Sequence, residues 1–175
     1  QTKYVQKLVE RFLPDGPLPH VQKNSMPYSG KFSERIIDAL SLEPGAHPSL
    51  LTDFQERVGC LMYAAGSSRP DIAYPVHQLC KCLQKPTPEL ILETDHLFSY
   101  LARLPSAGLT YEPKHADLRG YADASWETRN STSGWCIDWG SAVISWGSRK
   151  QKCVALSTCE AEIFSLSEAA KDMVY

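Results

Sequence analysis

The sequence predicts a mixed α+β fold, in which a helical segment is followed by a three-stranded antiparallel meander and a packing helix. Two observations carry this prediction. Apolar residues recur at helical spacing up to about residue 104, whereas aromatic and β-branched residues gather between glycine and serine residues after residue 112. Strands that are followed by a packing helix are typical of α+β domains.

The first fifty residues hold one short helix and a long, poorly patterned stretch. Apolar residues in KYVQKLVERFL, residues 3–13, recur at helical spacing and predict an amphipathic helix. Six of the twelve prolines lie between Pro14 and Pro48, so we expect an irregular connection that is broken by a turn of helix at SERIIDALSL. A connection of this length requires support from the rest of the chain or from a partner. Residues 1–50 form the first expected region.

Three further helices follow, joined by short loops. The first runs from Leu51 to Ala65 and ends at a Gly-Ser-Ser breaker, and the second begins behind Pro70. Thr87 is an N-cap residue with proline at the next position, and it opens the third helix. We expect residues 51–112 to form a helical connection segment and residues 113–175 to form the last domain.

The last domain should contain three strands and a helix. GYADASW predicts a strand around Tyr121, and GWCIDWG and AVISWGSRKQ predict the second and third strands. A helix should begin at Ser157 and continue to the chain end. Its apolar stripe, which we expect to face the sheet, consists of Ile163, Leu166, Ala170 and Val174, with Ala169 and Met173 beside it.

Two acidic residues at the start of this helix have different expected roles. Ser157 and Glu160 match the S-x-x-E capping box, so Glu160 already has a structural role. Glu162 lies at the edge of the stripe that should face the sheet, where a carboxylate is costly unless it is paired, protonated or bound to a cation. The alternative is that Glu162 reaches solvent from the first turn, where the helix dipole favours it.

Asp123 lies in the middle of an expected strand, where aspartate is disfavoured. Its alternative role is that of a strand-end cap. Together, Asp123 and Glu162 can converge on one face of the sheet, and two carboxylates with room for water and phosphate suit a hard cation such as Mg²⁺.

Composition sets limits on the remaining possibilities. The net charge of −2 means that any nucleic-acid contact must come from local basic patches. The chain has no apolar run long enough for a membrane segment, and it does not begin with methionine, so we expect a piece of a longer protein. Six cysteines without a CxxC pair predict free thiols in an intracellular compartment, cytoplasmic or nuclear.

Five blocks in one order resemble the polyproteins of copia-type LTR retrotransposons. YADASW, NSTSGW, AVISWGSRKQ and VALSTCEAEIFSLSEAAK resemble their ribonuclease H (RNase H) domain. The upstream block VGCLMYAAGSSRPDIAYPVHQLCKCLQKPTPE resembles the segment that precedes this domain, and the first helix resembles the end of the reverse transcriptase. The resemblance covers about residues 54–175. It implies a truncated RNase H-like fold behind a connection segment.

The resemblance also implies an activity, which is Mg²⁺-dependent cleavage of RNA in RNA–DNA hybrids at a two-metal site. Asp123 matches the aspartate of the first strand and Glu162 matches the helix glutamate, and both would be catalytic metal ligands. Ser125 stands where the family usually has a second aspartate. A third acid lies beyond this helix in the family, so whether this chain is an enzyme is uncertain, and we expect it to be inactive alone.

Residues near the second and third strands are candidates for contact with the phosphates of a hybrid. Basic side chains lie beside a tryptophan, and hydroxyl groups lie in the NSTSG block. An alternative is that these residues are only solvated hairpin ends. The candidates are Ser131, Thr132, Trp146, Arg149, Lys150 and Lys152.

Three hypotheses remain open. The first is a retrotransposon reverse transcriptase–RNase H segment, whose partners are an RNA–DNA hybrid and the rest of the polyprotein or another chain. The second is a domesticated or remnant segment that acts as a non-catalytic binding or scaffold subunit. The third is an integrase-type strand transferase, which the E-A-E sequence of the helix disfavours.

Overall fold

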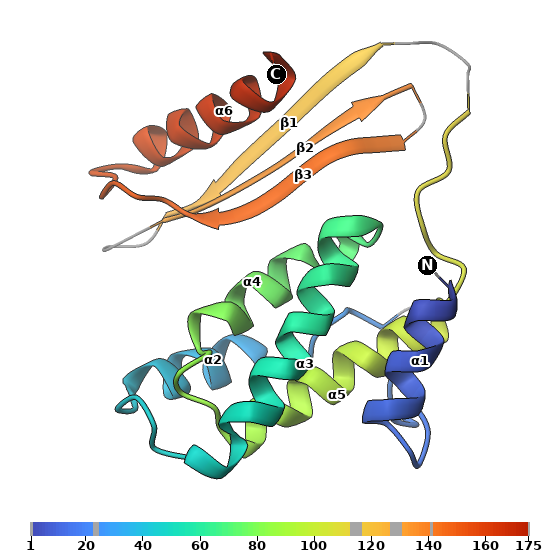
Figure 1. Cartoon of the computed structure of the whole chain (residues 1–175). Coiled ribbons are helices and arrows are strands. Elements are labelled where there is room, and N and C mark those ends of the chain that lie inside the picture. The colour runs from blue at the N-terminus through green and yellow to red at the C-terminus, as the bar shows by residue number, and fades with distance from the viewer. Residues whose placement is uncertain (1, 23–24, 113–116, 127–130, 141, 175) are drawn as a thin grey trace. The chain divides into compact units, whose positions relative to one another are not determined.

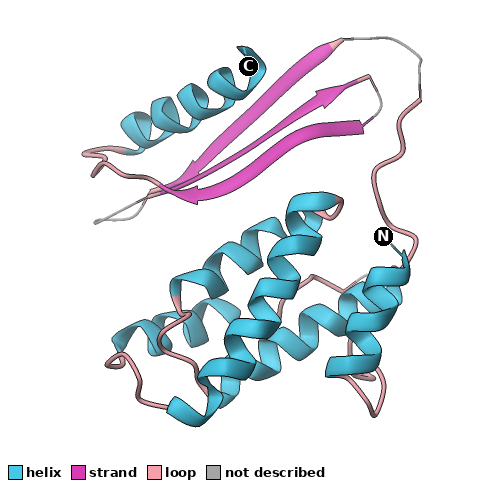
Figure 2. Ribbon diagram, in the orientation of Figure 1, coloured by secondary structure: helices cyan, strands magenta, loops and turns pink. Residues whose placement is uncertain are grey.

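The computed structural model describes residues 2–22, 25–112, 117–126, 131–140 and 142–174. The chain divides into two compact units, a helical unit of residues 1–108 and a sheet unit of residues 109–175 (Figures 1 and 2). Residues 1–50 and residues 51–108 of the second expected region therefore share one unit, whereas residues 109–112 belong to the sheet unit. Residues 113–116, where we expected the last domain to begin, lie outside the described residues.

The helical unit is built from five α-helices and one 3₁₀ turn among its described residues. The first, third and fifth helices lie where the sequence predicted them. The expected N-cap of the fifth helix is also present, because the Thr87 side chain accepts a hydrogen bond from the Leu90 amide. The segment SERIIDALSL forms most of a ten-residue helix rather than a single turn. The elements are α1 (Thr2–Phe12), α2 (Phe32–Ser41), α3 (Pro48–Ser67), η1 (Pro70–Ile72), α4 (Ala73–Lys81) and α5 (Pro88–Arg103).

One polar stripe of α5 holds the irregular connection. Glu93 is fully buried and accepts hydrogen bonds from the backbone amide and the hydroxyl of Ser29, and it forms an ion pair with Arg35. His96 contacts the Met26 carbonyl at 3.0 Å. Ser99 accepts a hydrogen bond from the Leu18 amide and Arg103 donates one to the Val21 carbonyl. Successive turns of α5 therefore supply the support that the connection requires.

The core of the helical unit is a continuous cluster of aliphatic and aromatic side chains from all five α-helices. At its margin, Arg69 is 2% exposed and contacts both carboxylate oxygens of Asp71, and Tyr100 donates to the same carboxylate at 2.9 Å. These contacts give Asp71 a structural role.

The sheet unit has three antiparallel strands in the order β1-β2-β3 and one helix along one face of the sheet (Figure 1). The elements are β1 (Leu118–Ser125), β2 (Thr132–Trp139), β3 (Ala142–Lys150) and α6 (Thr158–Val174). The predicted meander and helix are confirmed. A register shift between Ile137 and Asp138 marks a bulge in the β2–β3 ladder.

The buried face of α6 differs from the predicted apolar stripe. Ile163, Leu166 and Val174 are 59%, 57% and 80% exposed, and the residues buried against the sheet are instead Ala161, Ser165 and Ala169. Small residues allow the helix to approach the sheet closely. The Ser165 hydroxyl donates to the carbonyls of Asp123 and Gly134, at 2.6 and 3.0 Å. On the helix side the interface therefore consists of small residues where the sequence predicted large apolar side chains, and only Ala169 had been expected beside the stripe.

None of the helices in the described part of the chain has the length and apolar character needed to cross a bilayer.

Candidate functional site

Asp123 lies in β1, directly opposite Gly134 of β2. The neighbouring pair, Ala122 and Trp135, belongs to the face that α6 covers, because the Trp135 indole donates to Asp172 of α6 at 2.8 Å. A Cβ atom built on Gly120 would also meet Met173 of α6. Because side chains alternate along a strand, Asp123 projects from the opposite face, where it is exposed.

Glu162 lies on the first turn of α6 and is half-buried. It precedes Ser165 by one helical turn, and Ser165 bonds the backbone carbonyl of Asp123. Glu160 instead serves as a cap, since its carboxylate accepts from the Leu156 amide at 2.7 Å and its own amide donates to Ser157. The predicted capping role of Glu160 is confirmed.

The two candidate ligands therefore do not lie on one face of the sheet. Asp123 projects from the uncovered face, whereas Glu162 lies on the helix that packs on the other face. By the parity of β1 the two side chains start from different faces, and no contact between them is described, so their convergence on a shared metal stays a prediction. β1 is an edge strand of the described sheet.

Other acids of α6 have partners within the unit. Asp172 accepts from the Trp135 indole and the Ser145 hydroxyl, both at 2.8 Å, and Glu168 pairs with Lys171 at 2.6 Å. Among the described residues, no group of three or more histidine, cysteine, aspartate or glutamate side chains is arranged to hold a metal. Carboxylates suit Mg²⁺, but the described donors are too few for a two-metal site.

The six candidate nucleic-acid residues fall into separate environments. Ser131 and Thr132 are 0% and 4% exposed, so their side chains lie inside the unit. Trp146 is half-buried and pairs with Cys136 on the uncovered face. The basic residues Arg149, Lys150 and Lys152 are exposed and line one pocket.

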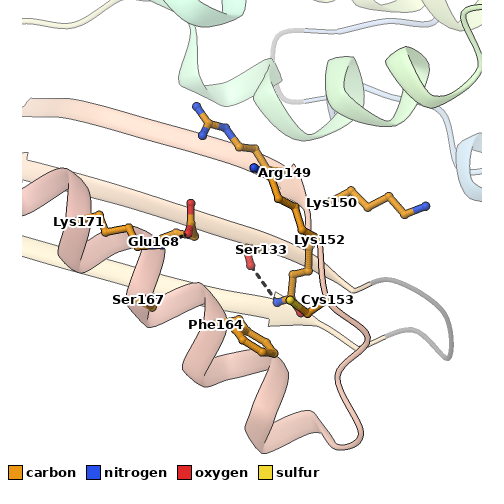
Figure 3. Close-up of a pocket in the computed structure, with 10 residues that line it drawn as sticks. Ser133, Arg149, Lys150, Lys152, Cys153, Phe164, Ser167, Glu168 and Lys171 are labelled. Carbon is orange, nitrogen blue, oxygen red and sulfur yellow. Dashed lines mark hydrogen bonds and ion pairs between the residues drawn. The ribbon is translucent and has the colours of Figure 1, made fainter.

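This pocket has a volume of about 400 Å³ and lies between the end of β3 and α6 (Figure 3). Arg149 and Lys152 come from β3 and the segment after it, and Lys171 comes from α6. Lys150 extends away from α6 (Figure 3). The complete lining is Ser133, Arg149, Lys150, Gln151, Lys152, Cys153, Phe164, Ser167, Glu168 and Lys171.

Sequence reasoning missed the contribution of α6 to this pocket. Phe164, Ser167, Glu168 and Lys171 are spaced i, i+3, i+4 and i+7, which places them on one face of a helix. The spacing was visible in the sequence, but the basic run of β3 gave no indication that this helix face would lie beside it.

The fold and the site define a mixed helix-and-sheet protein with two exposed or half-exposed carboxylates and a basic pocket in its sheet unit. The chain is similar to the retrovirus-related Pol polyprotein from transposon TNT 1-94 of Nicotiana tabacum, at 32% identity over all of this chain and 13% of that protein. It is 34% identical to the Pol polyprotein from transposon RE1 of Arabidopsis thaliana, over 77% of this chain and 9% of that protein. The chain belongs to the family of copia-type retrotransposon Pol polyproteins.

A third relative is much shorter. The chain is 37% identical to secreted RxLR effector protein 161 of Plasmopara viticola, over 67% of this chain and 87% of that protein. No family model matches the chain, and no solved structure matches it. The chain thus spans about a tenth of the length of the two polyproteins but most of the length of this relative.

Proposed function

We propose that the sheet unit is the N-terminal part of an RNase H-like domain, which cuts RNA in RNA–DNA hybrids when a further segment of the polyprotein completes it. The observation that carries the proposal is the topology, in which a three-stranded antiparallel meander with a mid-strand aspartate precedes a helix with a glutamate on its first turn. Membership of the Pol polyprotein family supports the same function.

Asp123 and Glu162 are the proposed metal ligands in the complete domain. When bound, the two Mg²⁺ ions would stabilise the attacking and leaving oxygens of a phosphodiester. Because the described donors are too few, a further acidic residue must come from outside the described residues. The free edge of β1 is where such a residue would have to approach Asp123.

The test is cleavage of a labelled RNA–DNA hybrid by a longer polyprotein segment that includes this chain. We expect Mg²⁺-dependent cleavage by the parent. The cleavage rate should fall by about a hundredfold or more in Asp123→Asn and in Glu162→Gln, because each substitution removes a charged metal ligand. Asp117→Asn removes an equal charge from an exposed residue before β1 and serves as the matched control. Parent-like cleavage by both site variants would reject the assignment.

A non-catalytic binding or scaffold role is the second candidate. Two observations favour it. Asp123 projects from the face opposite α6. In addition, this chain covers most of the length of one short relative. In that case the longer segment would bind a hybrid or a protein partner without cutting it. Binding in the presence of Mg²⁺ with no cleavage product would select this role over the first.

We also propose an intracellular location, cytoplasmic or nuclear. All six cysteines are free thiols, which suits a reducing compartment. Fractionation of cells that express a tagged chain tests this, and recovery in the medium would contradict it.

A further inference from the structure

The pocket between β3 and α6 concentrates positive charge on a chain whose net charge is −2. Four of its lining side chains are cationic and one is a carboxylate. Lys150 extends away from α6, so three cations and one carboxylate remain, which is a net charge of +2. Cations that surround a concave site focus the local field, and this field raises the local concentration of anions. The pocket therefore attracts ligands that the rest of the chain does not.

The floor of the pocket is fixed by hydrogen bonds that cross three segments. Gln151 is 8% exposed, and its amide nitrogen donates to the Ser133 hydroxyl and to the Ala161 carbonyl, both at 2.9 Å. The dashed line at Ser133 in Figure 3 marks the first of these bonds. These bonds join β2, the segment after β3 and α6. The guanidinium of Arg149 lies over the Trp135 ring, 5.3 Å from its centroid. The basic side chains thus project from a preorganised floor rather than from a loose loop.

The helix side of the pocket supplies both a cation and a wall. Phe164, Ser167 and Lys171 lie on one face of α6 and line the pocket. Ser133 is 2% exposed, and its hydroxyl accepts the hydrogen bond from Gln151, so it belongs to the floor. The Lys171 ammonium lies 2.6 Å from Glu168, with side chains that are 61% and 37% exposed. Glu168 therefore reduces the charge that Lys171 offers to a ligand.

We propose that this pocket binds one phosphate group of a nucleic-acid strand, held by Arg149, Lys152 and Lys171 and by the Ser167 hydroxyl. Several cations with hydroxyl donors are the chemistry that recognises a phosphate, and a volume of about 400 Å³ accommodates one nucleotide. The inference rests on the proposed function for the identity of the ligand, but it does not require cleavage or a metal.

The test is binding of a fluorescent RNA–DNA hybrid to the 175-residue chain in EDTA, followed by anisotropy over a range of salt concentrations. Lys171→Gln should weaken binding by roughly three- to tenfold and reduce the salt slope by about one. Glu168→Gln should instead strengthen binding, because it removes the pocket's negative charge and releases Lys171. Opposite signs from adjacent residues are not expected of a merely structural effect.

Matched controls come from an exposed pair in the same unit that does not line the pocket. Asp117 and Arg119 lie 3.5 Å apart, with side chains that are 75% and 62% exposed. Asp117→Asn and Arg119→Gln make the same changes of net charge as the two pocket variants. If these controls shift affinity as much as the pocket variants do, general electrostatics explains the binding and the pocket assignment is overturned.

Titration with inorganic phosphate, followed by amide NMR, locates the site independently. We expect the largest shifts at Ser133, Ser167 and Lys171, and competition between phosphate and the hybrid. Shifts at these amides without competition would assign the pocket to a small anion and overturn the strand assignment. Since EDTA prevents metal-dependent cleavage, failure here leaves the cleavage test untouched, and a failed cleavage test leaves this binding result intact.

Discussion

At the scale of single residues, a buried polar group joins separate segments of the helical unit. Glu93 is fully buried on α5 and is satisfied by Ser29, which lies in the connection before α2, and by Arg35 of α2. A buried carboxylate of this kind is stable only while its donors remain in place. The connection and the helix therefore depend on each other.

Glu93→Ala should destabilise the helical unit by about 3 kcal/mol, because Arg35 and Ser29 would lose their acceptor inside the protein. Glu56→Ala is the control, since Glu56 is 43% exposed in its ion pair with Arg11 and should contribute roughly 0.5 kcal/mol or less. Urea unfolding followed by circular dichroism at 222 nm measures both. Equal midpoints for the two variants would show that the Glu93 contacts contribute little.

His77 gives the helical unit a pH dependence. Burial, and then the charge of Lys81, lowers the pKa of His77 from 6.5 to about 4. As the pH falls, the imidazole takes up its proton in the unfolded chain before it does so in the folded chain. The contribution of neutral His77 to the free energy of unfolding is therefore present above pH 6.5 and is lost as the pH decreases to about 4. His77→Gln should remove this part of the decline, which is of order 2 kcal/mol at most, because solvent screens the half-exposed imidazole. Urea midpoints at pH 7 and pH 4.5 test this, and an unchanged difference between the two midpoints in the variant would contradict it.

The candidate site shows what residue patterns could and could not predict. The capping role of Glu160 followed from the S-x-x-E spacing, because the cap is local to one helical turn. The relation of Asp123 to Glu162 depends on strand parity, and one residue of register changes the face from which Asp123 projects. Sequence alone did not fix that parity, because β1 has little hydrophobic alternation.

At the scale of elements, the sheet and α6 show how small residues govern packing. The Trp135 ring occupies space above Gly147 of β3, so a Cβ atom at Gly147 would collide with the ring. Gly134, one residue before Trp135, would place a Cβ atom 3.9 Å from its nearest neighbour, which is ordinary contact. Only one of these two strand glycines is therefore required by packing.

Gly147→Ala should destabilise the sheet unit by about 1–3 kcal/mol, because the Trp135 ring would have to move within a packed layer. Gly134→Ala is the matched control and should be neutral or slightly stabilising. Tryptophan fluorescence during urea unfolding reports both, and a loss of stability in Gly134→Ala equal to that in Gly147→Ala would contradict the packing argument.

The same small residues explain why the buried face of α6 was mispredicted. Hydrophobic periodicity detects large apolar side chains, and in α6 it selected Ile163, Leu166 and Val174. The structure buries Ala161, Ser165 and Ala169, because Trp135 fills the layer between the helix and the sheet. In α5, where the N-cap is explicit, the prediction was correct, and the three strands also lie where the sequence predicted them.

At the scale of the whole molecule, the two units differ in how much apolar surface they bury. Among the described residues, 22 buried apolar residues form the core of the helical unit. The sheet unit contributes Trp135 and Ile137, and otherwise only buried alanines, at positions 142, 155, 161 and 169. Because burial of large apolar side chains is the main stabilising term, the sheet unit has the weaker core.

The two units should therefore unfold separately, with the sheet unit first. All four tryptophans lie in the sheet unit, so their fluorescence reports that unit alone, whereas circular dichroism at 222 nm reports chiefly the helical unit. In urea, the fluorescence midpoint should precede the dichroism midpoint by about 1 M or more, given typical denaturant dependences for units of this size. The 1–108 segment expressed alone should reproduce the later midpoint, because its buried cluster is complete without the sheet unit. Coincident transitions in the whole chain, together with an unfolded 1–108 segment, would show that the two cores depend on each other and would reject this account.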